Sequence, residues 1–301
     1  MPEARLELHA LREDPELCER FIEEENKLAA TDPAARERVV AMYWERDRKQ
    51  AFKRFSESLD FQQIDDLFAI FGVGREHEIC EIGGGSGQLA WSLAKAGYQH
   101  VDLLEPNALP ITGTGWLQSE IAAGRSNVRI CNSLDAWYAD DKLYDVIVTR
   151  NCVHHFPNIA MVAAAVHQKM RPGGRWVMIR EQFADTPEEL RAGLRNHPYC
   201  QKYKTYEFFF PARYYVESLE LAGFKLTSVV PAKYGNNALS TYSNDTGTPS
   251  NQRRTARWRS VLQRKPCLTV ACFRSENFLV RSFGYKRHRF TRPQVILFER
   301  V

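Results

Sequence analysis

The first residues with a pattern that could do chemistry form a glycine-rich turn. An apolar segment ending in Glu81-Ile82 is typical of a buried strand, and a helical pattern follows over 88–96. Between them lie Gly83, Gly84, Gly85 and Gly87. Glycine permits positive φ and close approach of the backbone to a ligand, and a helix N-terminus offers free N–H groups. NAD and FAD sites also use such a loop, so later residues must decide the ligand.

Two acidic residues narrow the choice of ligand. Glu105 ends a second apolar segment, His100 to Leu104, where a carboxylate can accept hydrogen bonds from both ribose hydroxyls and would repel a 2′-phosphate. The glycine spacing is Gly-x-Gly-x-Gly, whereas dinucleotide loops use Gly-x-Gly-x-x-Gly. Glu81 suits a cationic amino-acid group and would be unfavourable beside a pyrophosphate.

Four signals in order carry a family resemblance. They are Glu81-x-Gly83-x-Gly85-x-Gly87, Glu105, the segment Tyr144 to Val148, and Arg171-Pro172-Gly173-Gly174 before a further strand. Together they resemble the class I S-adenosylmethionine-dependent methyltransferases, over residues 75–230 and a last strand at 294–301. The resemblance implies an α/β, Rossmann-like, doubly wound sheet of seven strands whose last strand is antiparallel, with S-adenosyl-L-methionine as cofactor.

The resemblance also implies individual roles. Gly83 to Gly87 would lie against the methionine part of the cofactor, and Glu105 would hold the ribose. Asp135 would reach the adenine amine, although it stands one or two places later than usual, so the backbone of Ser133 or Leu134 is the alternative. Asn151, after the fourth strand, should face the cofactor.

Methyl transfer is an in-line displacement, so a hydroxyl acceptor also needs a base to remove its proton. His154 and His155 follow the fourth strand at the expected crevice, and we choose His155 as the base. The alternative is structural: one histidine caps the helix that begins near Asn158 while the other contacts the cofactor. No metal site is expected.

An aromatic segment follows the fifth strand and is expected to cover the acceptor as a lid over residues 183–215. Tyr203 and Tyr206 could orient a polar acceptor, and Glu207 is an alternative base. Ordinary core packing is the competing explanation, especially for Phe208 to Phe210.

These residues must be positioned by four regions of the chain. We expect a helical N-terminal cap over 1–74, with helices over 5–30, 34–57 and 61–71. The cofactor-binding core spans 75–230, with strands near 78–82, 100–105, 127–131, 144–149, 175–180 and 224–230 and a helix over 217–222. An insertion over 231–293 is predicted to hold a basic helix over 253–264 and strands over 267–273 and 278–283, before the last strand at 294–301.

Composition bounds the remaining properties. The chain has 301 residues, 44% of them hydrophobic, and seven scattered cysteines without a Cys-x-x-Cys pair, so we expect a cytoplasmic protein without disulfides or membrane spans. The net charge of +4 hides an asymmetry, because residues 251–301 carry 13 Lys and Arg against 2 Asp and Glu. This basic block could attract an anionic acceptor, a nucleic acid or a membrane surface, or could simply be a solvated exterior.

The predicted function is methylation of a small molecule, of the kind found in natural-product or surface-glycan pathways, with oxygen as the expected acceptor atom. N- or C-methylation is the alternative within that class. Nucleic-acid methylation through the basic block is a further alternative that we do not favour, because no Asn/Asp-Pro-Pro-aromatic run is present. A non-catalytic binding protein of the same fold is the remaining alternative, and the oligomeric state is left open.

Overall fold

A computed structural model describes residues 14–156, 158–196, 209–231, 259–287 and 292–301. Its centre is a seven-stranded sheet in the order β3-β2-β1-β4-β5-β7-β6. The strands are β1 (Glu78–Ile82), β2 (His100–Leu104), β3 (Arg129–Cys131), β4 (Tyr144–Arg150), β5 (Met170–Ile179), β6 (Phe224–Pro231) and β7 (Pro293–Arg300). Strand β7 is antiparallel to both of its neighbours, and β1 to β5 pair in parallel. The predicted fold is confirmed.

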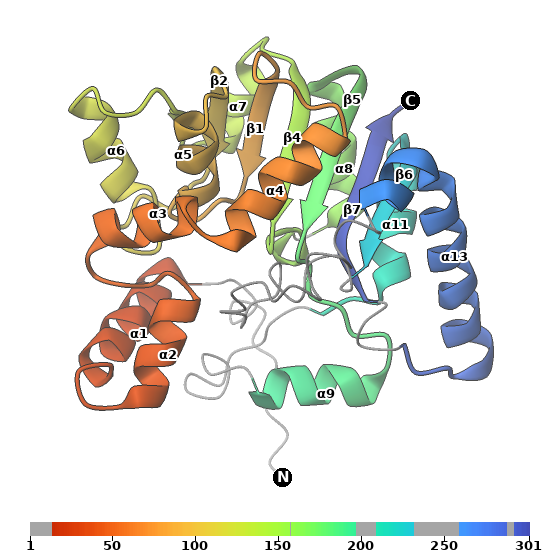
Figure 1. Ribbon diagram of the computed structural model, residues 1–301, viewed down its shortest axis with the longest axis horizontal. Helices are drawn as coiled ribbons and strands as arrows, with labels where there is room; N and C mark the ends of the chain where they lie inside the picture. Colours follow the sequence, from red (N-terminus) through yellow and green to blue (C-terminus); the bar gives the residue numbers. More distant parts are fainter. Residues whose placement is uncertain (1–13, 157, 197–208, 232–258, 288–291) are drawn as a thin grey trace.

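Helices cover both faces of the sheet (Figure 1). They are α1 (Pro15–Leu28), α2 (Pro33–Ala41), α3 (Arg48–Ser56), α4 (Leu59–Ile70), α5 (Gln88–Lys95), α6 (Gly115–Ala122), α7 (Leu134–Ala139), α8 (Ile159–Gln168), α9 (Pro187–Asn196), α11 (Ala212–Leu221) and α13 (Pro266–Phe283), with the short 3₁₀ helix η2 (Val153–His155). Several begin behind a side chain that accepts a hydrogen bond from the first turn: Asp14, Asp32, Asp47, Ser58 and Asn158.

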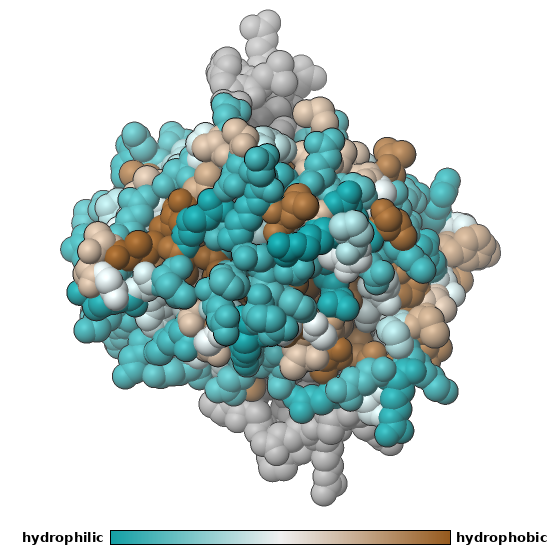
Figure 2. All heavy atoms as spheres, turned by 90° about the horizontal axis from the view of Figure 1, so that it is seen from above, coloured by the Kyte–Doolittle hydropathy of each residue, from teal (hydrophilic) through white to brown (hydrophobic). Residues whose placement is uncertain are grey.

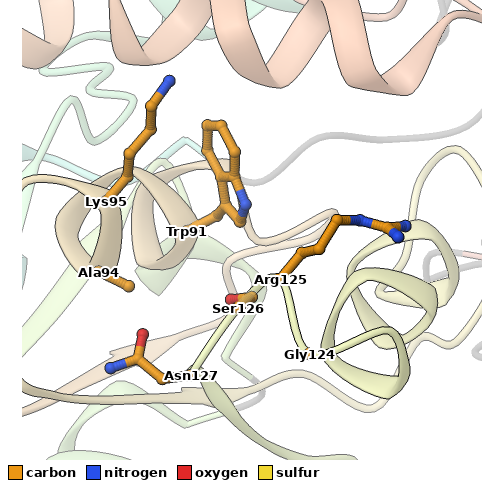
Figure 3. A pocket seen from close by; sticks show the side chains of 7 residues that line it. All are labelled: Trp91, Ala94, Lys95, Gly124, Arg125, Ser126 and Asn127. Carbon is orange, nitrogen blue, oxygen red and sulfur yellow. The ribbon is translucent and has the colours of Figure 1, made fainter.

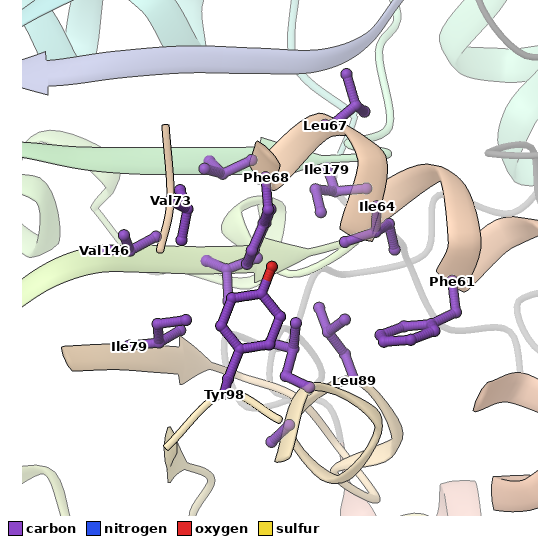
Figure 4. Packing of buried hydrophobic residues seen from close by; sticks show 14 of the residues in the cluster. Phe61, Ile64, Leu67, Phe68, Val73, Ile79, Leu89, Tyr98, Val146 and Ile179 are labelled. Carbon is purple, nitrogen blue, oxygen red and sulfur yellow. The ribbon is translucent and has the colours of Figure 1, made fainter. Parts of the chain in front are cut away.

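One hydrophobic cluster fills the space between the sheet and helices α3 to α6. Figure 4 shows Phe61, Ile64 and Phe68 of α4 pointing into this cluster, which also holds Val146 and Ile179 of the sheet. Phe68 is fully buried and meets the ring of Tyr98 edge to face, with centroids 5.8 Å apart. A second cluster lies on the other face, beneath α7, α8, α11 and α13. Packing in these two cores fixes the register of each strand relative to its neighbours, and therefore the position of the residues at its carboxyl end.

The N-terminal region differs from the prediction in two respects. The helix expected over 5–30 is interrupted at Asp14, which is the extended N-cap of α1, and residues 5–13 lie outside the described part of the chain. The single helix expected over 34–57 is two helices, α2 and α3, separated at Tyr43, whose φ is +56°. The carbonyl of Tyr43 accepts a hydrogen bond from the Arg48 guanidinium at 2.9 Å, which stabilises the break. Tertiary contacts of this kind override helix propensity, so the periodicity of the sequence did not reveal the break.

The segment after residue 264 also differs from the prediction. The strands expected over 267–273 and 278–283 are wrong, because α13 runs without interruption from Pro266 to Phe283 along β6. Thr269 and Phe273, four residues apart, are its buried positions, which is helical spacing. Its β-branched and aromatic residues suggested strands, but packing of this face decided the outcome. Residues 259–264 are helical, in agreement with the end of the predicted basic helix.

Figure 2 shows the molecule from the side on which the parallel strands begin. Hydrophilic side chains dominate this surface, and the apolar ones lie in separate patches. Within the described parts of the chain, no helix is long and apolar enough to cross a membrane.

Candidate cofactor and active site

The glycine loop follows β1 and leads into α5. Gly83, Gly85 and Gly87 have φ values of +66°, +55° and +81°, a region that other residues rarely adopt. At Gly83 a Cβ atom would also lie 2.0 Å from the Sγ atom of Cys152, which follows β4. The loop is therefore shaped by both its local conformation and its contact with the neighbouring strand end. It presents backbone at the carboxyl edge of the sheet, where ligands bind in this fold.

Glu81 lies behind this loop. Its side chain is buried, and one oxygen accepts a hydrogen bond of 2.8 Å from the N–H of Ala90 in α5. A Cβ at Gly84 would lie 2.5 Å from the Cδ atom of Glu81. Burial raises the pKa of the Glu81 carboxyl to about 7, although the Ala90 hydrogen bond opposes the shift. In this position Glu81 supports the loop and the first turn of α5.

Glu105 directly follows β2 and faces the glycine loop. One of its oxygens accepts a hydrogen bond of 2.8 Å from the N–H of Gly85, and the other accepts one of 2.9 Å from Asn107. Each carboxylate oxygen can accept more than one hydrogen bond, so this arrangement suits two adjacent hydroxyl groups as well. The contact with Gly85 joins the two predicted cofactor elements in one place.

The segment after β3 borders the same region. Asn132 donates a hydrogen bond of 2.6 Å to the carbonyl of Glu105, which fixes this segment beside β2. Ser133 caps α7 by accepting from Ala136, so its hydroxyl is already engaged. Leu134 and Asp135 form the exposed first turn of α7. Thus Asn132 lies beside Glu105, and Ser133, Leu134 and Asp135 follow it directly in the chain.

The turn after β4 is held by Glu181, a residue that was not predicted from the sequence. Asn151 has a φ of +53° and donates its N–H to Ile179 at 2.8 Å. Glu181, two residues after β5, accepts from the N–H groups of Cys152 and Val153, both at 2.9 Å. Burial alone would raise the pKa of the Glu181 carboxyl, but its hydrogen bonds, chiefly that from His154, hold it below its usual range. The sequence feature that could have identified Glu181 is an acidic residue just after the fifth strand, at the carboxyl edge of the sheet.

The two histidines occupy different environments. His154 is fully buried, and its Nδ1 atom lies 2.8 Å from Oε2 of Glu181. His155 is exposed, with its ring centroid 4.1 Å from that of His154. Neither histidine caps α8, because the side chain of Asn158 does so by accepting from the N–H of Met161. The structure thus separates a buried, anchored histidine from an accessible one.

The N-terminal helices lie against this site. Glu19 of α1 accepts hydrogen bonds from Ile111 and Thr112, in the segment after β2, at 2.8 and 2.7 Å. The Arg48 guanidinium donates to the hydroxyl of Ser86 in the glycine loop at 3.0 Å. In Figure 1, α1, α2 and α9 lie on the side of the sheet where the parallel strands end.

Three predicted residues, Tyr203, Tyr206 and Glu207, lie outside the described residues, as does residue 208. A surface hollow of about 430 Å³ lies elsewhere, at the end of α5 farther from the glycine loop (Figure 3). It is lined by Trp91, Ala94, Lys95, Gly124, Arg125, Ser126 and Asn127. Across the described segments, no group of three or more His, Cys, Asp or Glu side chains is arranged to hold a metal ion.

Similar folds occur among solved structures. A proposed sarcosine dimethylglycine methyltransferase from Galdieria sulphuraria is 14% identical, with a TM-score of 0.48, and the match covers 84% of this chain and 87% of that one. An S-adenosylmethionine-dependent methyltransferase from Geobacter sulfurreducens, in complex with S-adenosyl-L-homocysteine, is 14% identical, with a TM-score of 0.43 and coverages of 79% and 89%. The mitomycin 7-O-methyltransferase MmcR is 16% identical, with a TM-score of 0.42 and coverages of 68% and 56%.

A comparison with curated protein sequences finds no match. The methyltransferase domain family, in contrast, matches residues 30–229, well over half of the chain. The matched region contains the glycine loop, Glu105, Asn151, both histidines and Glu181. The chain therefore belongs to the methyltransferase domain family, as a class I S-adenosylmethionine-dependent methyltransferase.

Proposed function

We propose that this protein methylates a hydroxyl group of a small molecule, with His155 as the general base. The observation that carries the proposal is the turn after β4, where Glu181 anchors Cys152, Val153 and His154 while His155 stays exposed. A base must be accessible to the acceptor and held in a defined position. His155 is exposed and therefore accessible to an acceptor. The adjacent ring of the anchored His154 supports a defined position for it.

The cofactor supplies a methyl group bound to a positively charged sulfur. In the proposal, the backbone of Gly83 to Gly87 approaches its methionine part, and the Glu105 carboxylate accepts from its ribose hydroxyls. The left-handed glycine conformations and the contact between Glu105 and Gly85 support this placement. Asp135, or in its place the backbone of Ser133 or Leu134, would reach the adenine amine, and Asn151 would face the cofactor.

The acceptor is then bound between this turn and the segment over 183–215, where Tyr203, Tyr206 and Glu207 stay predicted acceptor contacts. His155 removes the hydroxyl proton as the oxygen attacks, and Glu181 keeps the turn from shifting.

We also propose the division predicted from the sequence, with a cap over 1–74, a core over 75–230, an insertion over 231–293 and a last strand over 294–301. Glu19 and Arg48 support the cap, because they bind segments beside the cofactor site.

The test compares His155→Ala with His100→Ala. His100 is also exposed but begins β2, at the opposite edge of the sheet. Release of S-adenosylhomocysteine is measured on a panel of phenols, hydroxylated carboxylic acids and sugars, and cofactor affinity is measured by calorimetry. His155→Ala should lower turnover about 10²–10⁴-fold with cofactor affinity unchanged, as loss of a general base predicts. An equal loss of cofactor affinity would contradict a role as base.

The same assay separates the alternatives. Turnover only on amines, or on carbon acids, would replace O-methylation by N- or C-methylation. Salt-sensitive binding and methylation of RNA or DNA would instead assign the basic block to a nucleic acid. Tight cofactor binding without turnover on any panel would favour a non-catalytic binding protein of this fold.

A further inference from the structure

Two arginines at the carboxyl edge of the sheet share a single carboxylate. Arg150 ends β4, and Arg180 directly follows β5. Both guanidinium groups donate to Oδ2 of Asp60, in the first turn of α4, at 2.9 and 3.0 Å. The side chains of Asp60 and Arg180 are 8% and 9% exposed, and that of Arg150 is 19% exposed. The cluster therefore holds two positive charges and one negative charge out of bulk water.

The hydrogen bonds of this cluster are incomplete. Oδ1 of Asp60 and the Nε atoms of Arg150 and Arg180 are buried without a partner in the part of the chain that the structure describes. Buried charges are normally paired, because an uncompensated one is costly to remove from water. Burial lowers the pKa of Arg180 to about 10, and the nearby charge of Arg150 contributes. Among the described residues, both arginines form their ion pairs with Asp60, and Glu81 interacts electrostatically with Arg150 without forming an ion pair, so the two guanidinium groups share one ion-pair partner.

Backbone strain coincides with this cluster. Within the described residues, the non-glycine positions with positive φ are Tyr43, Asn151 and Arg180, at +56°, +53° and +58°. Arg180 belongs to the cluster, and Asn151 adjoins Arg150. Tyr43 meets Phe55 edge to face, with centroids 5.1 Å apart, and Phe55 lies 4.8 Å below the Arg150 guanidinium. Strained conformations persist where the surroundings hold them, and they concentrate at binding sites.

The cluster borders the cofactor crevice. Strands β1 and β4 pair in parallel with Ile82 level with Thr149, so Arg150 is level with Gly83, the first residue of the glycine loop. Strands β4 and β5 pair with Arg150 level with Ile179, so Arg180 is level with Asn151. The surplus positive charge therefore lies at the strand ends where ligands bind in this fold.

We propose that Arg150 and Arg180 form a recessed binding site for a carboxylate of a ligand in the crevice, which supplies the missing negative charge. The inference rests on the proposed function. Guanidinium groups bind carboxylates through paired hydrogen bonds, and Asp60 holds both arginines in place until the ligand arrives. Two ligands offer this chemistry: the amino-acid end of the cofactor and an acidic acceptor. The binding experiment distinguishes them.

The first arm uses two nucleosides that differ in the carboxylate. S-adenosylhomocysteine has the amino-acid end, whereas 5′-methylthioadenosine has the same adenosine and thioether without it. If the site holds the cofactor, Arg180→Met weakens S-adenosylhomocysteine binding at least tenfold in calorimetry and changes methylthioadenosine binding less than twofold. Arg150→Met should do the same.

The second arm tests the acceptor as the source. Sodium benzoate is titrated against the protein, alone and saturated with S-adenosylhomocysteine, with sodium chloride at equal ionic strength as the reference. If the acceptor fills the site, benzoate raises the unfolding midpoint of the saturated wild type, and Arg180→Met abolishes the rise while nucleoside affinity stays constant. If the protein binds neither nucleoside, the proposed function is refuted. The titration with benzoate alone would then still test whether the two arginines bind a carboxylate.

Matched variants exclude a purely structural role. Arg171→Met removes an exposed arginine paired with Asp145 at the opposite edge of the sheet and should change neither arm. Arg180→Met should leave the unfolding midpoint of the free protein unchanged or higher, because it removes the surplus charge. Asp60→Asn should tighten carboxylate binding, because it removes the competing negative charge but keeps a side-chain oxygen that can accept from the arginines. A lower midpoint for Arg180→Met, with both binding arms unchanged, would show a structural ion pair and overturn the proposal.

Discussion

Replacing Glu81 by glutamine should stabilise the protein above neutral pH. The folded-state pKa of Glu81 is raised from 4.5 to about 7, so the folded protein binds this proton more tightly than the unfolded chain does. Wild-type stability therefore falls as the pH rises from about 4.5 to 7. At 1.36 kcal/mol for each pKa unit, the loss is about 3 kcal/mol. The amide that replaces the carboxyl does not titrate, and its carbonyl oxygen can still accept from Ala90.

The assay is urea unfolding of wild type and Glu81→Gln at pH 5, 6, 7 and 8. The variant should gain stability relative to wild type across this range, with the difference levelling off above pH 7. Affinity for S-adenosylhomocysteine should change less than about twofold, because Glu81 supports the loop from behind. A constant difference from pH 5 to 8 would refute the raised pKa. A tenfold loss of affinity would instead support the direct contact between Glu81 and the cationic cofactor group that is predicted from the sequence.

Two further substitutions test the turns around the crevice. Gly83→Ala should cost about 2–5 kcal/mol in urea unfolding, since it combines an unfavourable positive φ with a Cβ 2.0 Å from Sγ of Cys152. Cys152→Ala should restore part of that loss in the double variant, and strict additivity would contradict the contact. Glu181→Gln should cost about 3–5 kcal/mol at neutral pH, because it leaves the buried His154 and its turn without their charged partner. Since the pKa of Glu181 is lowered, this cost should shrink as the pH falls below the usual glutamate range, and an unchanged cost at pH 4 would oppose the assignment.

Local sequence was sufficient for the sheet and the glycine loop. The strands β1, β2 and β4 are short apolar segments, and Gly83, Gly85 and Gly87 adopt positive φ where the sequence places the turn. Glu105 was also predictable, because a residue that follows a parallel strand must lie at the carboxyl edge. The order of strands then brings it to Gly85, although the two are 20 residues apart.

Local sequence was insufficient where tertiary contacts compete with propensity. Residues 266–283 are rich in β-branched and aromatic side chains, yet they form α13, because Thr269 and Phe273 pack on one helical face. The break at Tyr43 depends on Arg48 and on packing against Phe55. In both places the deciding interaction joins two segments, such as the hydrogen bond from Val229 of β6 to Thr269 of α13, and hydrophobic periodicity does not report such contacts.

By itself the sequence determined the fold, the cofactor and which residues lie at the strand ends, because these follow from spacing, glycine conformation and the direction of parallel strands. Only the tertiary structure decided how those residues pair. Glu181 reaches His154 across 27 residues, and Asp60 reaches Arg150 and Arg180 across 90 and 120. Such pairs depend on which strands are neighbours and on how deeply each side chain is buried. Burial sets the cost of an unpaired charge, and that cost is a property of the folded core and not of any local segment.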